Sequence, residues 1–187
     1  MRRSLIIGFI IISTILMVCG LISWVGLQGF LFAWILNLML MMCVFQFTLT
    51  LKPEFKSTYY NEKKWEKKGE IYKSLGVNVF RKLLVLIGWE KLNKKANPVK
   101  KSLDALIHLE YVTKQSELGH IIIFFIVILF TIFVAVKFGI TESLWLLILN
   151  VALNVYPIIL QRYNRPRLKK AIQISRISKP KKITYKV

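Results

Sequence analysis

Two residues at the start of the third apolar stretch of the sequence could act together as an acid–base pair. Glu117 and His120 are three residues apart, so a helix would place them on one face and within reach of each other. A carboxylate beside an imidazole orients the ring and favours its protonated form, an arrangement used in general base catalysis. The same spacing is also typical of an interfacial histidine hydrogen-bonded to a neighbour, so both interpretations stay open.

A second set of polar residues lies in and just after the fourth apolar stretch. Its members recur every three or four residues, so they share one side of a helix: Asn150, Asn154, Pro157, Gln161 and Asn164 with Arg165. Polar groups at membrane depth are costly, so this side is predicted to face a helix bundle rather than lipid. Proline lacks an N–H, and Pro157 should therefore free a main-chain carbonyl beside the stripe.

Three arginines follow directly after this stripe. Arginine forks suit bidentate binding of phosphate or carboxylate, which makes Arg162, Arg165 and Arg167 candidate anion ligands. The Asn and Pro among them predict a shaped turn. The alternative is a basic anchor at the membrane surface, which is the preferred interpretation for Lys169 and Lys170.

Four apolar stretches must position these residues. Over half of the chain (55% of 187 residues) is hydrophobic, and the hydrophobic residues cluster in segments that lack Lys, Arg and Asp: residues 4–25, 27–51, 118–136 and 143–160. Each has about the 17–25 residues that a helix needs to cross a hydrocarbon core of roughly 30 Å. The sequence predicts an all-α integral membrane protein with four transmembrane helices. Residues 1–51 form one hairpin, and residues 118–168 form the second.

The distribution of charge predicts the orientation. The net charge is +19, and the basic residues lie at the N-terminus, in residues 52–117 and in residues 161–187, whereas the two short links are nearly uncharged. The positive-inside rule therefore places both termini and the long loop in the cytoplasm of a bacterial cell, with the protein in its cell membrane. Residues 169–187 form a basic cytoplasmic tail.

The long loop, residues 52–117, is expected to lie along the membrane. It is rich in the aromatic residues that prefer the headgroup level, including Trp65 and Tyr72. Residues 79–92 combine apolar positions at helical spacing with Arg81 and Lys82. That pattern indicates an amphipathic interfacial or re-entrant helix, too short to span the bilayer.

Other classes of function fit the sequence less well. The high positive charge is explained by attraction to anionic headgroups, and no nucleic-acid-binding signature accompanies it. Cys19 and Cys43 both fall inside predicted spans, as packing residues rather than a disulfide framework. Only two histidines are present, so no metal site and no cofactor is expected. Membrane lipids are the expected surroundings and partners.

Three motifs resemble those of the glycosyl-4,4'-diaponeurosporenoate acyltransferases, which act late in the staphyloxanthin-type carotenoid pathway. Residues 154–168, NVYPIILQRYNRPRL, are similar to their N-x-P-I-I-x-Q-R-Y-N-R-P-R-L signature, with Tyr156 as an extra residue. Residues 113–120 resemble T-x-x-A-E-x-x-H, with Ser116 in place of Ala. Residues 65–72 resemble W-E-x-x-G-x-x-Y. The resemblance covers roughly residues 59–168.

This resemblance implies transfer of a fatty acyl chain to a hydroxyl of a lipid-linked sugar, a glycosyl carotenoid or another glycolipid. His120, oriented by Glu117, would take the proton from that hydroxyl, and the three arginines would hold phosphates of the donor or the developing oxyanion. The remaining polar and aromatic candidates would bind sugar hydroxyls or cover the site: Asn154, Gln161, Asn164, Trp65 and Tyr72. The donor would be acyl-CoA or an acyl carrier protein, although the His-x-x-x-x-Asp acyltransferase box is absent.

A non-catalytic function is the main alternative. A membrane lipid-binding or assembly subunit would need only the anchors and the basic surface. An interfacial transferase or reductase of another class would share the same base and basic residues. The acyl donor, the acceptor and the oligomeric state are not determined by the sequence.

Overall fold

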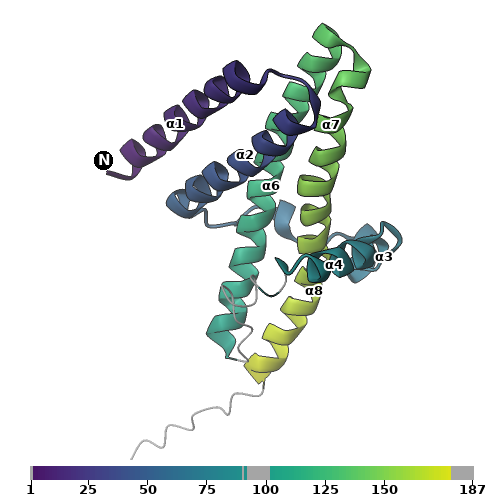
Figure 1. Cartoon of the computed structure of the whole chain (residues 1–187). Coiled ribbons are helices and arrows are strands. Elements are labelled where there is room, and N and C mark those ends of the chain that lie inside the picture. Colours follow the sequence, from purple (N-terminus) through teal and green to yellow (C-terminus); the bar gives the residue numbers. More distant parts are fainter. Residues whose placement is uncertain (1, 90, 92–101, 178–187) are drawn as a thin grey trace, which may run out of the picture. The chain divides into compact units, whose positions relative to one another are not determined.

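The computed structural model describes residues 2–89, 91 and 102–177, and it contains helices and no strands in that part of the chain (Figure 1). The predicted end of the amphipathic segment at residue 92 and the basic tail beyond Ile177 lie outside the described residues.

Four helices are long and apolar enough to cross a membrane, as the sequence predicted. The first three are α1 (Arg2–Val25), α2 (Gly29–Leu51) and α6 (Leu103–Phe138). The fourth is a continuous helical run built from α7 (Ile140–Asn150), η3 (Val151–Val155) and α8 (Tyr156–Ile177). Their length and composition make this a membrane protein.

The helix that contains Glu117 and His120 is longer than its apolar stretch. The α6 helix has 36 residues and begins at Leu103. Its first turns belong to the predicted long loop, and they form one continuous helix with the third span. Its N-terminal part carries charged residues, including the ion pair of Lys114 with Glu110 at 2.9 Å.

The shaped turn predicted around Pro166 is wrong. Helix α8 runs through Pro166 and ends only at Ile177. An interior proline removes one helical hydrogen bond, but packing of a buried face can outweigh that loss. Tyr163, Arg165 and Ile172 are the buried residues of this helix, and they hold it together on both sides of the proline.

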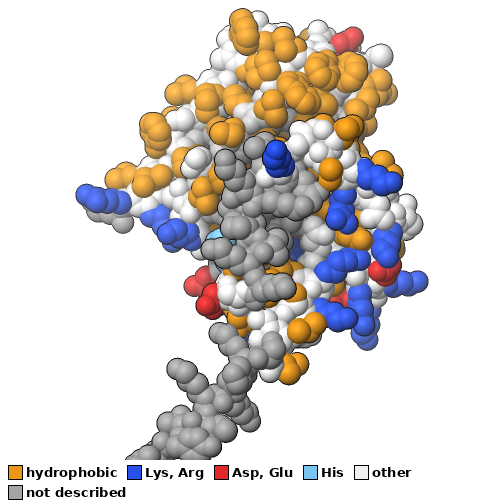
Figure 2. All heavy atoms as spheres, turned by 60° about the horizontal axis from the view of Figure 1, so that its bottom comes forward, with side chains coloured by type: hydrophobic (Ala, Val, Ile, Leu, Met, Phe, Trp, Pro, Cys, Tyr) orange, Lys and Arg blue, Asp and Glu red, His pale blue; other side chains and the backbone are white. Residues whose placement is uncertain are grey.

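The chain divides into two units, the first made of Met1–Lys56 with Gln115–Ile159. Its core consists of apolar side chains from α1, α2, α6 and α7, among them Leu36, Val127 and Leu146. Large apolar side chains also cover its exterior, with Phe9 of α1 72% exposed and Leu129 of α6 67% exposed. Figure 2 shows hydrophobic side chains gathered over one part of the surface and Lys and Arg side chains gathered elsewhere. An apolar exterior is what lipid contact requires.

The helical run of the fourth span contains one wide turn. In η3 the hydrogen bonds join residues five apart, and the Tyr156 N–H bonds to the Val151 carbonyl. Pro157 has no N–H to offer Leu153, four residues earlier, so α-helical pairing is interrupted here. Wide turns of this type are frequent at functional sites. Asn154 lies within this turn.

The second unit comprises Ser57–Lys114 and Leu160–Val187. Besides the N-terminal part of α6 and most of α8, it contains four short elements: η1 (Thr58–Tyr60), η2 (Lys64–Gly69), α3 (Ile71–Ser74) and α4 (Val77–Leu86). Helix α4 follows Gly76, whose φ of 80° favours glycine. Helix α4 confirms that the first part of the predicted segment, residues 79–92, is helical. Its apolar residues Val79, Leu83 and Leu86 are exposed. Its location at the membrane surface stays a prediction.

Candidate functional site

The imidazole of His120 has a partner that the sequence analysis did not assign. Its Nδ1 lies 3.3 Å from the Oδ1 of Asn154 in the first unit. Pro157 has no N–H to give the carbonyl of Leu153, four residues earlier, and the freed carbonyl expected beside Pro157 stays a prediction. His120 is half-buried.

Asn154 is the centre of an amide network. Its Nδ2 donates to Asn37 Oδ1 at 2.8 Å and to Asn150 Oδ1 at 2.9 Å. The two outer amides donate in turn to main-chain carbonyls. Asn37 bonds to Ala33 at 2.8 Å, and Asn150 bonds to Phe124 at 3.1 Å. Asn154 is only 2% exposed, so its amide is engaged inside the protein.

Asn37 was missing from the predicted site. It is 3% exposed in α2, and its bond to Asn154 joins residues 117 positions apart. Its signal in the sequence is its type, because it is an asparagine inside an apolar span where polar groups are rare. Sequence spacing within one helix could not pair it with a residue of another helix.

Glu117 occupies the position expected from the sequence, on α6 one turn before His120. Its side chain is fully buried. The proposed pairing of this carboxylate with the imidazole stays a prediction.

The second unit contains a charged network centred on Glu66. This residue is 4% exposed, and its carboxylate accepts three hydrogen bonds. The donors are the Lys63 N–H at 2.6 Å, the Tyr72 hydroxyl at 2.5 Å and the Arg162 guanidinium at 2.7 Å. Two motifs far apart in the sequence therefore meet in this unit. Glu66 and Tyr72 belong to the motif of residues 65–72, and Arg162 belongs to the motif of residues 154–168.

These contacts shift the pKa values of the two acidic partners in opposite directions. Burial raises the pKa of Glu66, but hydrogen bonds from Tyr72, Lys63 and Arg162, together with the charge of Arg162, outweigh it and hold this pKa below its ordinary value. Burial and the bond to the Glu66 carboxylate raise the pKa of Tyr72. Glu66 is therefore ionised and Tyr72 protonated at neutral pH.

Gly69 allows the first of these motifs to pack against α8. Its φ is +86°, and a Cβ at this position would lie 3.2 Å from the carbonyl oxygen of Tyr163. Lys67 and Lys68, just before it, also have positive φ values. The glycine of the W-E-x-x-G-x-x-Y pattern is thus required both by backbone conformation and by close approach.

The three arginines of the candidate anion site differ in their surroundings. Arg162 pairs with Glu66 and lies 4.4 Å from the ring centre of Tyr59. Arg165 is 4% exposed and lies over the Tyr60 ring, with a 3.5 Å bond to the Tyr60 carbonyl.

Arg167 is the most exposed of the three. Its guanidinium lies 3.7 Å from the ring centre of Tyr163 and donates to the carbonyl of that residue. It also forms an ion pair with Glu70 at 3.5 Å. Stacking of this kind uses the flat guanidinium, which lysine lacks.

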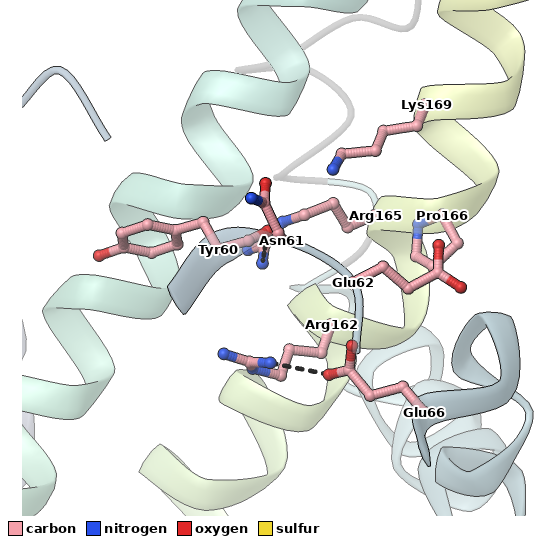
Figure 3. Close-up of a pocket in the computed structure, with 8 residues that line it drawn as sticks. All are labelled: Tyr60, Asn61, Glu62, Glu66, Arg162, Arg165, Pro166 and Lys169. Carbon is pink, nitrogen blue, oxygen red and sulfur yellow. Dashed lines mark hydrogen bonds and ion pairs between the residues drawn. The ribbon is translucent and has the colours of Figure 1, made fainter. Parts of the chain in front are cut away.

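A small cavity opens beside Arg162 and Arg165 (Figure 3). Its volume of about 10 Å³ suits a single water molecule. The lining is mostly charged and polar: Tyr60, Asn61, Glu62, Glu66, Arg162, Arg165, Pro166 and Lys169. The Arg162–Glu66 ion pair forms one wall.

The other predicted site residues, Trp65, Gln161 and Asn164, belong to the second unit. Trp65 is 58% exposed, and its ring meets the Tyr72 ring edge-on at 6.2 Å. Gln161 and Asn164 lie half-buried on α8. The sequence analysis missed Glu66, Tyr59 and Tyr60 as site residues. Only Glu66 carried a signal, as the acidic position of its motif.

Comparison with known proteins identifies the family. The model of the glycosyl-4,4'-diaponeurosporenoate acyltransferase family matches residues 56–174, which is more than half of the chain. No curated protein and no solved structure matches significantly. The matched range contains the Glu66 network, Glu117, His120 and the arginines at positions 162, 165 and 167. The chain belongs to the glycosyl-4,4'-diaponeurosporenoate acyltransferase family.

Proposed function

We propose that this protein is an O-acyltransferase that esterifies a hydroxyl of a lipid-linked sugar, with a thioester as acyl donor. The family supports acyl transfer, and a glycosyl carotenoid or a related glycolipid is the acceptor class that its name suggests. The observation that carries the proposal furthest is His120, a half-buried imidazole held by an amide network in a membrane protein. Ionisable groups in such surroundings are rarely retained without a function.

The reaction needs one proton acceptor that later becomes a donor. The His120 imidazole takes the proton of the acceptor hydroxyl as its oxygen attacks the carbonyl carbon of the acyl group. The carbon–sulfur bond of the thioester then breaks, and the imidazolium returns the proton to the thiolate of acyl-CoA or acyl carrier protein. The products are the ester and the free thiol. Glu117 would support the protonated ring.

The arginines of α8 would bind the charged part of the donor. Arg165 and Arg167 hold their guanidinium groups over tyrosine rings, and such pre-positioned forks suit phosphate. Arg162 is neutralised by Glu66, so we assign it a mainly structural role. Gln161, Asn164 and Trp65 remain candidates for contacts with the sugar or the lipid.

Lipid analysis of cells with and without the gene tests the proposal. Deletion should remove an acylated glycolipid and cause the unacylated acceptor to accumulate. Restoring the wild-type gene should reverse both changes, whereas a His120→Gln gene should not. An unchanged lipid profile would favour the alternative, a non-catalytic lipid-binding or assembly subunit.

The proposed orientation, with the long loop and both termini in the cytoplasm, has its own test. In a background without Cys19 and Cys43, cysteines placed at Lys56 and Lys170 should resist an impermeant thiol reagent in intact cells. A cysteine at Gln28, in the short link between α1 and α2, should react. Labelling of the first two from outside would overturn this orientation.

A further inference from the structure

We infer that Asn154 is a positioning residue that fixes the tautomer of His120, leaving Nε2 as the atom that accepts the proton. This inference rests on the proposed role of His120 as base. It goes further because it names the reactive nitrogen and the residues that select it.

The two outer amides of the network, Asn37 and Asn150, each meet a main-chain carbonyl. A main-chain carbonyl can only accept a hydrogen bond, so the groups that meet the carbonyls of Ala33 and Phe124 must be NH₂ groups. The oxygens of Asn37 and Asn150 are thereby turned the other way, towards Asn154. The orientation of both outer amides is fixed by the backbone.

The orientation of the central amide then follows. Two amide oxygens face Asn154, at 2.8 Å from Asn37 and 2.9 Å from Asn150. Only an NH₂ group can donate to both, so its two hydrogens are used there. The Oδ1 of Asn154 must face the imidazole, where it can only accept.

The orientation of the Asn154 amide in turn determines the tautomer of His120. An acceptor 3.3 Å from Nδ1 requires that this nitrogen carry the proton. In a neutral ring Nε2 is then unprotonated, with its lone pair available to a hydroxyl. Free imidazole side chains prefer the opposite tautomer, so the network reverses an intrinsic preference. A wrong tautomer at a catalytic histidine lowers turnover strongly even when the geometry is kept.

Nitrogen-15 NMR of the full-length protein in nanodiscs reads the tautomer directly. The chain has only His108 and His120, so ¹⁵N-histidine labelling of a His108→Gln variant leaves one imidazole in the spectrum. At pH 8, couplings to the ring carbon-bound protons should assign the proton to Nδ1. A proton on Nε2, or on both nitrogens, would overturn the inference.

Variants then show whether Asn154 is responsible. In Asn154→Leu the His120 ring should no longer be held in the Nδ1–H tautomer. We expect kcat to fall by roughly tenfold or more, with a smaller effect on KM. Thr131→Val is the matched control, since the Thr131 hydroxyl bonds only within α6, to the Val127 carbonyl at 2.8 Å. It should change neither quantity. An unchanged tautomer in Asn154→Leu would contradict the positioning role.

The proposed function can fail separately. If the Nδ1–H tautomer is found but His120→Gln turns over normally, the positioning stands and the base is another group. If His120→Gln is inactive but the proton is on Nε2, the base stands and the positioning by Asn154 is wrong.

Discussion

The two units of this chain hold their polar groups by different means. In the first unit, three asparagines and a histidine form a network of neutral groups, in which each amide has a defined direction. In the second unit, a buried carboxylate and three arginines are held by ion pairs and aromatic rings. Ionising a group is costly where the surroundings are apolar, so neutral hydrogen bonds suit the membrane-spanning unit. The charged network would suit the charged acyl donor that we propose.

This difference predicts where chemistry will be lost most completely. His120→Gln should reduce acyl transfer by roughly 10²–10⁴-fold, the usual contribution of a general base. If Glu117 works with it, Glu117→Gln should also lose most activity, and the double variant little more. Product assays in membranes with matched protein levels check this. Small, additive losses of activity would show that the two residues do not act as a unit.

The charged network should be more important for stability. Glu66→Ala leaves Arg162 and Tyr72 without their buried acceptor and should cost about 3 kcal/mol. Glu70→Ala is the control, because that carboxylate is half exposed and exposed ion pairs contribute little to stability. Urea-dependent cleavage of the second unit by trypsin measures both. Equal effects would contradict the buried network.

The same carboxylate predicts the response of this unit to acid. The pKa of Glu66 is lower in the folded protein than its ordinary value of 4.5, because its three donors favour the ionised form. The stability that ionised Glu66 gives the second unit is therefore fully present above about pH 4.5, and it is lost as the pH falls through the pKa of Glu66 in the folded protein. Glu66→Gln should flatten this part of the stability profile. A wild-type profile that stays flat below pH 4.5 would argue against the shift.

The stacked arginines should distinguish binding from simple positive charge. Arg165→Lys and Arg167→Lys keep the charge but lose the planar fork, and turnover should fall about tenfold, or about 1.4 kcal/mol. Lys170→Ala should change little, because it is exposed and many basic residues remain. Full activity of the Arg→Lys variants would show that these positions need only positive charge, as a basic anchor at the membrane surface does.

Gly69 should contribute less to stability than Glu66 does. Gly69→Ala introduces a side chain at positive φ and against the Tyr163 carbonyl, which should cost about 1–2 kcal/mol of stability. Gly88→Ala has the same φ problem, at +77°, but open space around it. The difference between the two variants isolates the close approach to α8. No difference would show that only the backbone conformation matters.

The sequence predicted the four spans, but it did not predict the contacts between segments far apart in the chain. Apolar stretches of the right length predicted the four long helices, because a bilayer demands long uninterrupted apolar segments. Helical spacing placed His120 and Asn154 correctly within their own helices. It could not pair Asn37 with Asn154 or Glu66 with Arg162, because those contacts depend on tertiary packing between distant segments. The predicted turn at Pro166 failed for the same reason, since buried neighbours keep α8 helical.

One reconstitution tests the central claim most directly. Purified full-length protein in liposomes would receive a long-chain acyl-CoA and a glycosyl carotenoid, and mass spectrometry would follow the ester and free CoA together. We expect wild type to form both in equal amounts over time, and His120→Gln to form neither above background. Acylation at the same rate by His120→Gln would contradict the account.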